Sequence, residues 1–390
     1  MYPTIYHLVK DLFGFEIGIL RVVQSFGFFV AFGFLSAAFF WTNELKRKEE
    51  LGLLNPQKVK RIENAPVSLV ERIFMLLISF VLGFKLLGIT MNYDEFIQKP
   101  PAYLLSAKGN LFGGIIGLAI AWYMQYSDAK KLKGKAQVEK ELLMHPYEHV
   151  GNMIMIAVVS GILGAKIFHN LENPDEFMAD PVGAMFSFSG LTMYGGLILG
   201  AICVIYYAKR NKLTVLHVVD ASAPAIMLGY AVGRVGCQVA GDGDWGIDNL
   251  AAKPDWMSFL PDWMWAYNYP HNVNSVGIPI PGCMEEEHCA MLANPVFPTP
   301  FYETIMCTFL FGVLWMVRKK IQAPGLMFSL YLLLNGIERF LIESIRVNSV
   351  YHIFGRDITQ AQIISSILIL LGIAGIVYFR KKHSNTISQS

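Results

Sequence analysis

The sequence predicts an all-α, polytopic membrane protein with about nine transmembrane helices. Hydrophobic residues make up 54% of the 390 residues and charged residues only 16%, whereas soluble domains carry about 25% charged residues. The mean hydropathy is +0.42. Long apolar segments alternate with short basic ones, as expected for helices that cross a bilayer. The chain contains no low-complexity tract and no nucleic-acid-binding motif, so we expect no nucleic acid partner.

Nine apolar segments approach the length of a spanning helix, which needs roughly 20 mostly apolar residues. In chain order they are 17–41, 69–90, 109–126, 148–169, 194–208, 215–236, 300–318, 325–345 and 361–379. The third and fifth are the shortest, and both contain glycine. A large soluble helical core is the alternative interpretation. The basic clusters between the nine segments argue against it.

The loop charges predict an orientation, because Lys and Arg accumulate in cytoplasmic loops. Of the 32 Lys and Arg residues, 20 lie in segments 42–68, 127–147, 209–214, 318–323 and 380–390. These are every second loop. We therefore predict that the N-terminus lies outside and the C-terminus inside. The long segment 237–299, between the sixth and seventh helices, is then an arm or head on the outer face.

Charged residues close two of the apolar segments at the predicted outer face. Arg234 lies near the end of the sixth, while Arg339, Glu343 and Arg346 lie near the end of the eighth. Their i, i+4, i+7 spacing places the last three on one helix face. A charge at membrane depth costs about 2.5–3.5 kcal/mol and usually marks function. Two arginines suit a phosphate ligand; an internal ion pair without a ligand is the alternative.

Further motifs converge on this face. A glycine-rich motif opens the fifth segment, a basic residue and a histidine end the fourth, and a Tyr-Glu pair opens the seventh. An acidic residue followed by Ala-Pro starts the sixth, near its predicted inner end. These are Gly190 to Leu197 with Tyr194, Gly195 and Gly196; Lys166 and His169; Tyr302 and Glu303; and Asp220 with Ala223-Pro224.

In their order along the chain, these motifs resemble those of the prolipoprotein diacylglyceryl transferase family. The Gly-Arg signature runs from Gly233-Arg234 through Gly236 and Asp242 to Gly246. The other matching motifs are Asp220 with Ala223-Pro224, Tyr194-Gly195-Gly196-Leu197, Pro298 to Tyr302-Glu303, Arg339 with Glu343 and Arg346, Gly164-Ala165-Lys166, and Phe26-Gly27. The resemblance covers the first helix and about 150–379.

The resemblance implies an integral inner-membrane enzyme. It would transfer a diacylglyceryl group from phosphatidylglycerol to the lipobox cysteine in the signal peptide of a prolipoprotein, giving a thioether and glycerol phosphate. No metal or dissociable cofactor is expected. The expected catalytic residues are Arg234, Arg339, Asp242, Glu343 and Tyr194. The expected substrate-binding residues are Gly195, Gly196, Gly236, Gly246, Arg346, Lys166, His169, Tyr302, Glu303, Asn335 and Phe26.

The resemblance also implies a seven-helix core with an inserted pair. Residues 1–41 hold the first core helix, 42–147 the inserted basic loops and two extra helices, and 148–236 the fourth to sixth helices. Residues 237–299 form the periplasmic arm or head, and 300–390 hold the last three helices and a basic cytoplasmic tail. The sequence assigns no function to the insertion.

Several positions depart from the family pattern. Tyr194 stands where the family has histidine, Cys237 where it often has asparagine, and Phe26 and Asn335 where it has tyrosine. Asp242 replaces a common glutamate, in a turn with one extra residue. The general base therefore stays unassigned, and Tyr194 is interpreted as a positioning group because tyrosine, with a pKa of about 10, is a poor base. An inactive paralogue that binds lipoprotein precursors, and a lipid or anion transporter, are the alternatives.

The five cysteines lack the spacing of metal ligands. Cys203, Cys237 and Cys307 lie in or beside apolar segments and are interpreted as packing residues. Cys283 and Cys289 share the hydrophilic segment 237–299. A disulfide between them is possible in an outer segment, and the sequence leaves it open.

Overall fold

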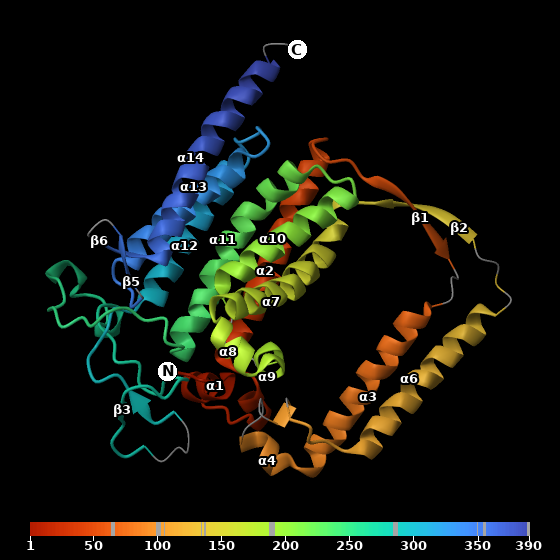
Figure 1. The fold of residues 1–390 in the computed structure, drawn as a ribbon, viewed down its shortest axis with the longest axis horizontal. Coiled ribbons are helices and arrows are strands. Elements are labelled where there is room, and N and C mark those ends of the chain that lie inside the picture. The colour runs from red at the N-terminus through yellow and green to blue at the C-terminus, as the bar shows by residue number, and fades with distance from the viewer. Residues whose placement is uncertain are drawn as a thin grey trace. The chain divides into compact units, whose positions relative to one another are not determined.

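The fold was obtained as a computed structural model, which describes residues 1–63, 67–98, 103–104, 106–133, 135, 138–186, 192–283, 288–348, 350–353 and 356–387. Its long helices are α2 (Ser25–Glu50), α3 (Leu69–Met91), α6 (Leu111–Leu132), α7 (Val150–Glu172), α10 (Met193–Arg210), α11 (Val215–Ala240), α12 (Thr299–Val317), α13 (Leu326–Glu343) and α14 (Gln360–Ile387) (Figure 1). Each falls on one of the nine predicted apolar segments.

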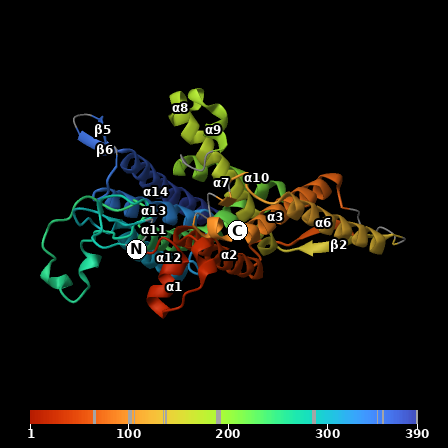
Figure 2. The ribbon, with the colours of Figure 1, turned by 90° about the horizontal axis from the view of Figure 1, so that it is seen from below.

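The shorter helices are α1 (Ile5–Phe13), α4 (Tyr93–Gln98), α8 (Pro174–Ala179) and α9 (Pro181–Phe186), with 3₁₀ turns at Gly18–Val22, Pro146–His149, Asp255–Met257 and Asp262–Met264. Helices α8 and α9 follow the end of α7 (Figure 2). The strands of the described residues form three two-stranded sheets. They join β1 (Gln57–Glu63) to β2 (Val138–Met144), β3 (Ile278–Pro279) to β4 (Ala290–Met291), and β5 (Val350–Ile353) to β6 (Arg356–Thr359). The last two pairs are antiparallel.

Six helices of the described chain are long and apolar enough to cross a membrane. They cover Ser25–Glu50, Leu69–Met91, Pro146–Glu172, Val215–Ala240, Thr299–Val317 and Gln360–Ser384. The predicted class of polytopic, mainly helical membrane protein is thereby confirmed. The number of nine spans and the orientation stay predictions.

The first helix begins later than the sequence predicted. The apolar segment was expected at 17–41, but α2 covers Ser25–Glu50. Before it, Gly18–Val22 form a 3₁₀ turn, and residues 23–25 pair with residues 3–5. The amide of Ile5 donates to the carbonyl of Val23 at 2.9 Å and that of Ser25 to Pro3 at 3.0 Å. At its other end the helix continues beyond the apolar run, where Glu44 accepts hydrogen bonds from Arg47 and Arg318.

The chain divides into two compact units. One comprises Met1, 26–57 and 145–390, and the other comprises 2–25 and 58–144. In the second unit, α3 and α6 form a hairpin whose backbones approach closely at glycines. A Cβ on Gly83 would stand 2.2 Å from the carbonyl oxygen of Gly113, so glycine is required at this crossing.

The first unit is built around α11. Near its start, α11 packs with α2, α7 and α10 around Trp41, Leu45, Met153, Ala208 and Val218. Further along, it packs with α12 and α13 around Met227, Ala231, Cys307, Leu314 and Met327. Asp220 of α11 also accepts the backbone amides of Gly325 (2.7 Å) and Phe328 (2.9 Å) at the start of α13. These contacts fix α13 beside α11, and α13 and α14 lie side by side in both views (Figures 1 and 2).

Candidate functional site

Three arginines converge on one buried carboxylate between α11, α12 and the end of α13. Glu303 of α12 is completely buried. Its oxygens pair with the guanidinium of Arg234, with Arg346 Nη1 at 3.0 Å and with Arg339 Nη1 at 3.7 Å. The Tyr230 hydroxyl donates to the same carboxylate at 2.8 Å. We refer to Arg234, Arg339, Arg346 and Glu303 as the arginine cluster.

Helical spacing accounts for the local arrangement. Tyr230 and Arg234 are one turn apart on α11, so both reach Glu303. On α13, Arg339 Nη2 lies 3.4 Å from Glu343 Oε2, as the predicted i, i+4 spacing requires. Glu343 is also buried. Arg339 and Glu343 share one helix face as predicted, but α13 ends at Glu343. Arg346 therefore lies in the turn beyond the helix, where it meets Arg234 at Glu303 and Asp244.

A second carboxylate, that of Asp244, bridges two arginines of the cluster. It pairs with Arg234 and, at 2.8 Å, with Arg346 Nη2. Burial alone would raise the pKa of the Asp244 carboxyl, but the charges of Arg234 and Arg346 lower it below its ordinary value. Asp242 was the acidic residue expected at this site; among the described residues the ion pairs with Arg234 and Arg346 are made by Asp244, two positions further along the turn.

The turn that carries Asp244 is tied to the neighbouring elements. The Thr299 hydroxyl donates to the Asp244 carbonyl at 2.7 Å, and the amide of Gly246 donates to Phe297 at 2.9 Å. Gly246 pairs with Arg346 as an isolated bridge. A Cβ on Gly246 would stand 2.4 Å from the carbonyl oxygen of Ile345. Glycine is therefore needed for this turn to hold its position beside Arg346.

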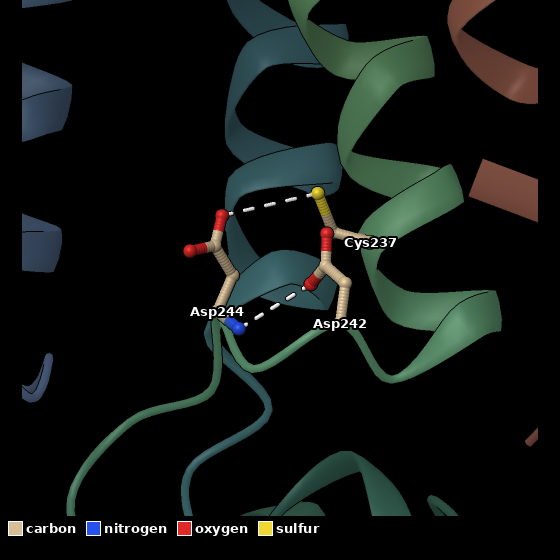
Figure 3. Close-up of side chains that lie close together, drawn as sticks. All are labelled: Cys237, Asp242 and Asp244. Carbon is tan, nitrogen blue, oxygen red and sulfur yellow. Dashed lines mark hydrogen bonds between the residues drawn. The ribbon is translucent and has the colours of Figure 1, made fainter. Parts of the chain in front are cut away.

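Cys237, Asp242 and Asp244 lie close together at the end of α11 (Figure 3). Their ligand atoms lie within 4.8 Å of one another, a spacing that a metal ion could bridge. However, Arg234 Nη1 lies 3.6 Å from Cys237 Sγ and pairs with Asp244. The guanidinium already supplies the positive charge there, so these residues fit an arginine partner better than a metal ion.

The Asp242 carboxyl accepts a hydrogen bond from the Asp244 amide at 3.3 Å. Burial and the negative charge of Asp244 raise the pKa of Asp242.

Other predicted residues gather on the pair α7–α10. Tyr194, Gly195 and Gly196 lie in the first turn of α10, and Lys166 and His169 lie near the end of α7. A Cβ on Gly195 would stand 2.6 Å from the carbonyl oxygen of Gly164, so these glycines allow the two helices to touch. The first two residues of the motif, Gly190 and Leu191, lie outside the described residues.

The remaining predicted residues make no hydrogen bond or ion pair with the three arginines in the part of the chain that the structure describes. The Tyr302 hydroxyl donates to the carbonyl of Met264 at 2.9 Å and anchors segment 237–299 to α12. Gly236 packs on α2, where a Cβ would stand 3.2 Å from the Phe26 carbonyl oxygen. Asn335 lies one turn before Arg339 on α13. Cys283 and Cys289 form a disulfide in segment 237–299.

Sequence reasoning missed three residues of this region. They are Tyr230 and Asp244, which contact the cluster, and Glu338, which is buried beside Arg339. Spacing could have identified Tyr230, four residues before Arg234. A second carboxylate in the apolar segment of Arg339, besides Glu343, could have drawn attention to Glu338.

Comparisons with known proteins agree with the family resemblance of the sequence motifs. The family model described as prolipoprotein diacylglyceryl transferase matches residues 129–378. A phosphatidylglycerol–prolipoprotein diacylglyceryl transferase of Dehalococcoides mccartyi is 28% identical over 238 residues, which cover 60% of this chain and 79% of that protein. Proteins of the same name from Leptospira interrogans (26% over 258 residues, 60% and 70%) and Corynebacterium efficiens (30% over 241 residues, 60% and 68%) are also similar.

Proposed function

This chain belongs to the prolipoprotein diacylglyceryl transferase family, and we propose on that premise that the arginine cluster is the place where it holds its lipid substrate. The chain is a multi-pass membrane protein and a transferase of lipoprotein maturation. Like its named relatives, it moves a diacylglyceryl group from phosphatidylglycerol to a prolipoprotein. The convergence on Glu303 of three arginines, from α11, from α13 and from the turn after α13, is the observation that carries the assignment of the site.

Two unpaired guanidinium donors of the site suit a phosphodiester. Glu303, Asp244 and Glu343 together offset the three guanidinium groups. Two guanidinium nitrogens, Arg339 Nη1 and Arg346 Nε, are buried and have no hydrogen-bond acceptor among the described residues. Unpaired buried donors cost free energy. A phosphate oxygen would relieve that cost, and the fork of a guanidinium matches its geometry.

The transfer then proceeds by displacement at the glyceryl carbon. The thiol sulfur of the lipobox cysteine forms a C–S bond to this carbon, and the C–O bond to the phosphate breaks. The electron pair stays on the phosphate oxygen, so the leaving glycerol phosphate gains a negative charge. The guanidiniums of Arg234 and Arg339 stabilise that charge as it develops. Tyr194 of α10 positions the incoming substrate.

The site faces outward in this proposal. The basic loops predict that the end of α11 and the end of α13 lie at the outer face of the bacterial inner membrane. Phosphatidylglycerol would enter from the outer leaflet, and the signal peptide of the prolipoprotein from the same side.

Replacing an arginine of the cluster by lysine tests its role in binding phosphate. Lysine keeps the positive charge but lacks the paired N–H donors of the guanidinium group. Arg234→Lys should lower diacylglyceryl transfer from radiolabelled phosphatidylglycerol to a lipobox peptide by about 10²-fold or more, the scale expected when one preorganised donor is lost. Arg318→Lys is the matched control, since Arg318 pairs with Glu44 at 3.0 Å at the other end of the bundle. Equal activity of the two variants would refute the phosphate role of the cluster.

A further inference from the structure

A fourth carboxylate lies behind the arginine cluster. Glu338 is 1% exposed, and neither of its side-chain oxygens has a hydrogen-bond partner among the described residues. It continues the face of α13 formed by Met327, Tyr331 and Leu334, which packs against α11 and α12. An apolar residue would be expected at this position of the helix.

The charges around Glu338 come from all three helices packed there. From α11 it faces Arg234 and Tyr230, from α12 Glu303 and the Cys307 thiol, and from α13 Arg339 and Tyr331. No described guanidinium or ammonium nitrogen lies within ion-pair distance of its oxygens, whereas Glu303, Asp244 and Glu343 all have such a partner. Glu338 is thus within reach of the cluster's charges without being paired to any of them.

The balance of charges in the cluster favours a neutral Glu338. The three arginines carry three positive charges, and Glu303, Asp244 and Glu343 carry three negative ones. An ionised Glu338 would be a fourth, unpaired negative charge in an apolar position, and burying such a charge is costly. A protonated carboxyl avoids that cost. Substrate binding favours the protonated carboxyl further, since a phosphodiester brings another negative charge to the same place.

We propose that Glu338 holds a proton in the resting enzyme and gives it to the phosphate of the leaving glycerol phosphate during transfer. The step rests on the function proposed above. As the C–O bond breaks, the phosphate gains one negative charge and takes the proton from Glu338. The thiol loses its proton as the C–S bond forms, and that proton returns to Glu338. The net charge of the buried site is then the same before and after transfer, so no new charge has to be desolvated.

The resting state can be tested without measuring activity. In infrared difference spectra at about pH 7, an ordinary glutamate with a pKa of about 4.3 is ionised. The wild-type protein should therefore show the C=O stretching band of a protonated carboxylic acid, and Glu338→Gln should lack it. Asp262→Asn is the control, because the Asp262 side chain is 94% exposed and contributes no such band. A wild-type spectrum without the band would overturn the proposal.

The unfolding temperature of Glu338→Gln gives a second test of whether Glu338 is protonated at rest. Glutamine has the shape of a protonated glutamic acid and the same charge, so Glu338→Gln should unfold in detergent within a few degrees of wild type. A fall as large as that caused by Glu303→Gln would show that Glu338 is ionised and would overturn the proposal.

Transfer kinetics test the proton movement. Glu338→Gln should lower kcat on the order of 10²-fold, a typical contribution of a positioned acid or base, while KM for phosphatidylglycerol changes little. Unchanged kcat in Glu338→Gln would overturn the proton transfer. Absence of transfer by the wild-type protein would instead refute the proposed function, and the infrared result would still stand.

Discussion

Replacement of Glu303 by glutamine should be among the most damaging single changes in this protein. Glu303 is completely buried, and it pairs with Arg234 and Arg346 and lies 3.7 Å from Arg339. Glutamine has nearly the same shape but no charge. The variant Glu303→Gln would leave three buried guanidinium groups with Asp244 and Glu343 as their remaining carboxylates.

The structure sets the size of the effect. Removing one partner of a buried ion pair costs about 3–5 kcal/mol, because the other charge stays buried and uncompensated. Asp244→Asn should lower the free energy of unfolding by less than this. Its side chain is 36% exposed, and it contacts two arginines, so water can take over part of its role.

Thermal unfolding in detergent, followed by the fluorescence of the tryptophans, measures this difference. Glu303→Gln should lower the unfolding temperature more than Asp244→Asn does. The reverse order, or an unchanged unfolding temperature for Glu303→Gln, would refute the view that Glu303 neutralises the cluster.

Three further predictions concern the C-terminal end of α11 and the segment that follows it. Gly246→Ala should destabilise the protein by about 1–3 kcal/mol, the usual cost of overpacking, because a Cβ would stand 2.4 Å from the Ile345 carbonyl oxygen; an unchanged unfolding temperature would contradict this. Asp242 has a raised pKa from burial and from its acidic neighbour, so its ionised form costs stability as the pH rises through the folded pKa. Asp242→Asn should therefore raise the unfolding temperature near pH 7 but not near pH 3, below its unfolded pKa of about 3.9; equal effects at both would contradict the shift. After reduction, Cys283 and Cys289 should react with a membrane-impermeant thiol reagent added outside intact cells, and labelling only after lysis would contradict the predicted orientation.

The membrane helices were predictable from the sequence because the bilayer imposes a length and a composition on each one separately. The predicted segment 69–90 coincides with α3 at Leu69–Met91, for example. The first segment was misplaced because apolar residues before Ser25 are also compatible with membrane contact. Whether they continue a helix depends on pairing with residues 3–5, and this pairing is not visible in composition.

Residues of the site were predictable where a single helix carries the relationship. Arg339 and Glu343 needed only the helical period, whereas Arg346 lies beyond the end of α13 and is placed by its bridge to Gly246. The role of Asp244 depends on the path of a turn, and that of Glu303 on the packing of α12 between two other helices. Neither relationship is local in sequence.

The sequence by itself determined that the chain is a membrane protein, roughly where its long helices lie, and that arginines stand near the ends of two of them. Only the tertiary structure decided which carboxylates neutralise those arginines and which one, Glu338, has no ion-pair partner among the described residues. The physical reason is that pairing of buried charges depends on distances of a few ångströms between helices, and residues that pair in this way are as far apart in the chain as Arg234 and Glu303.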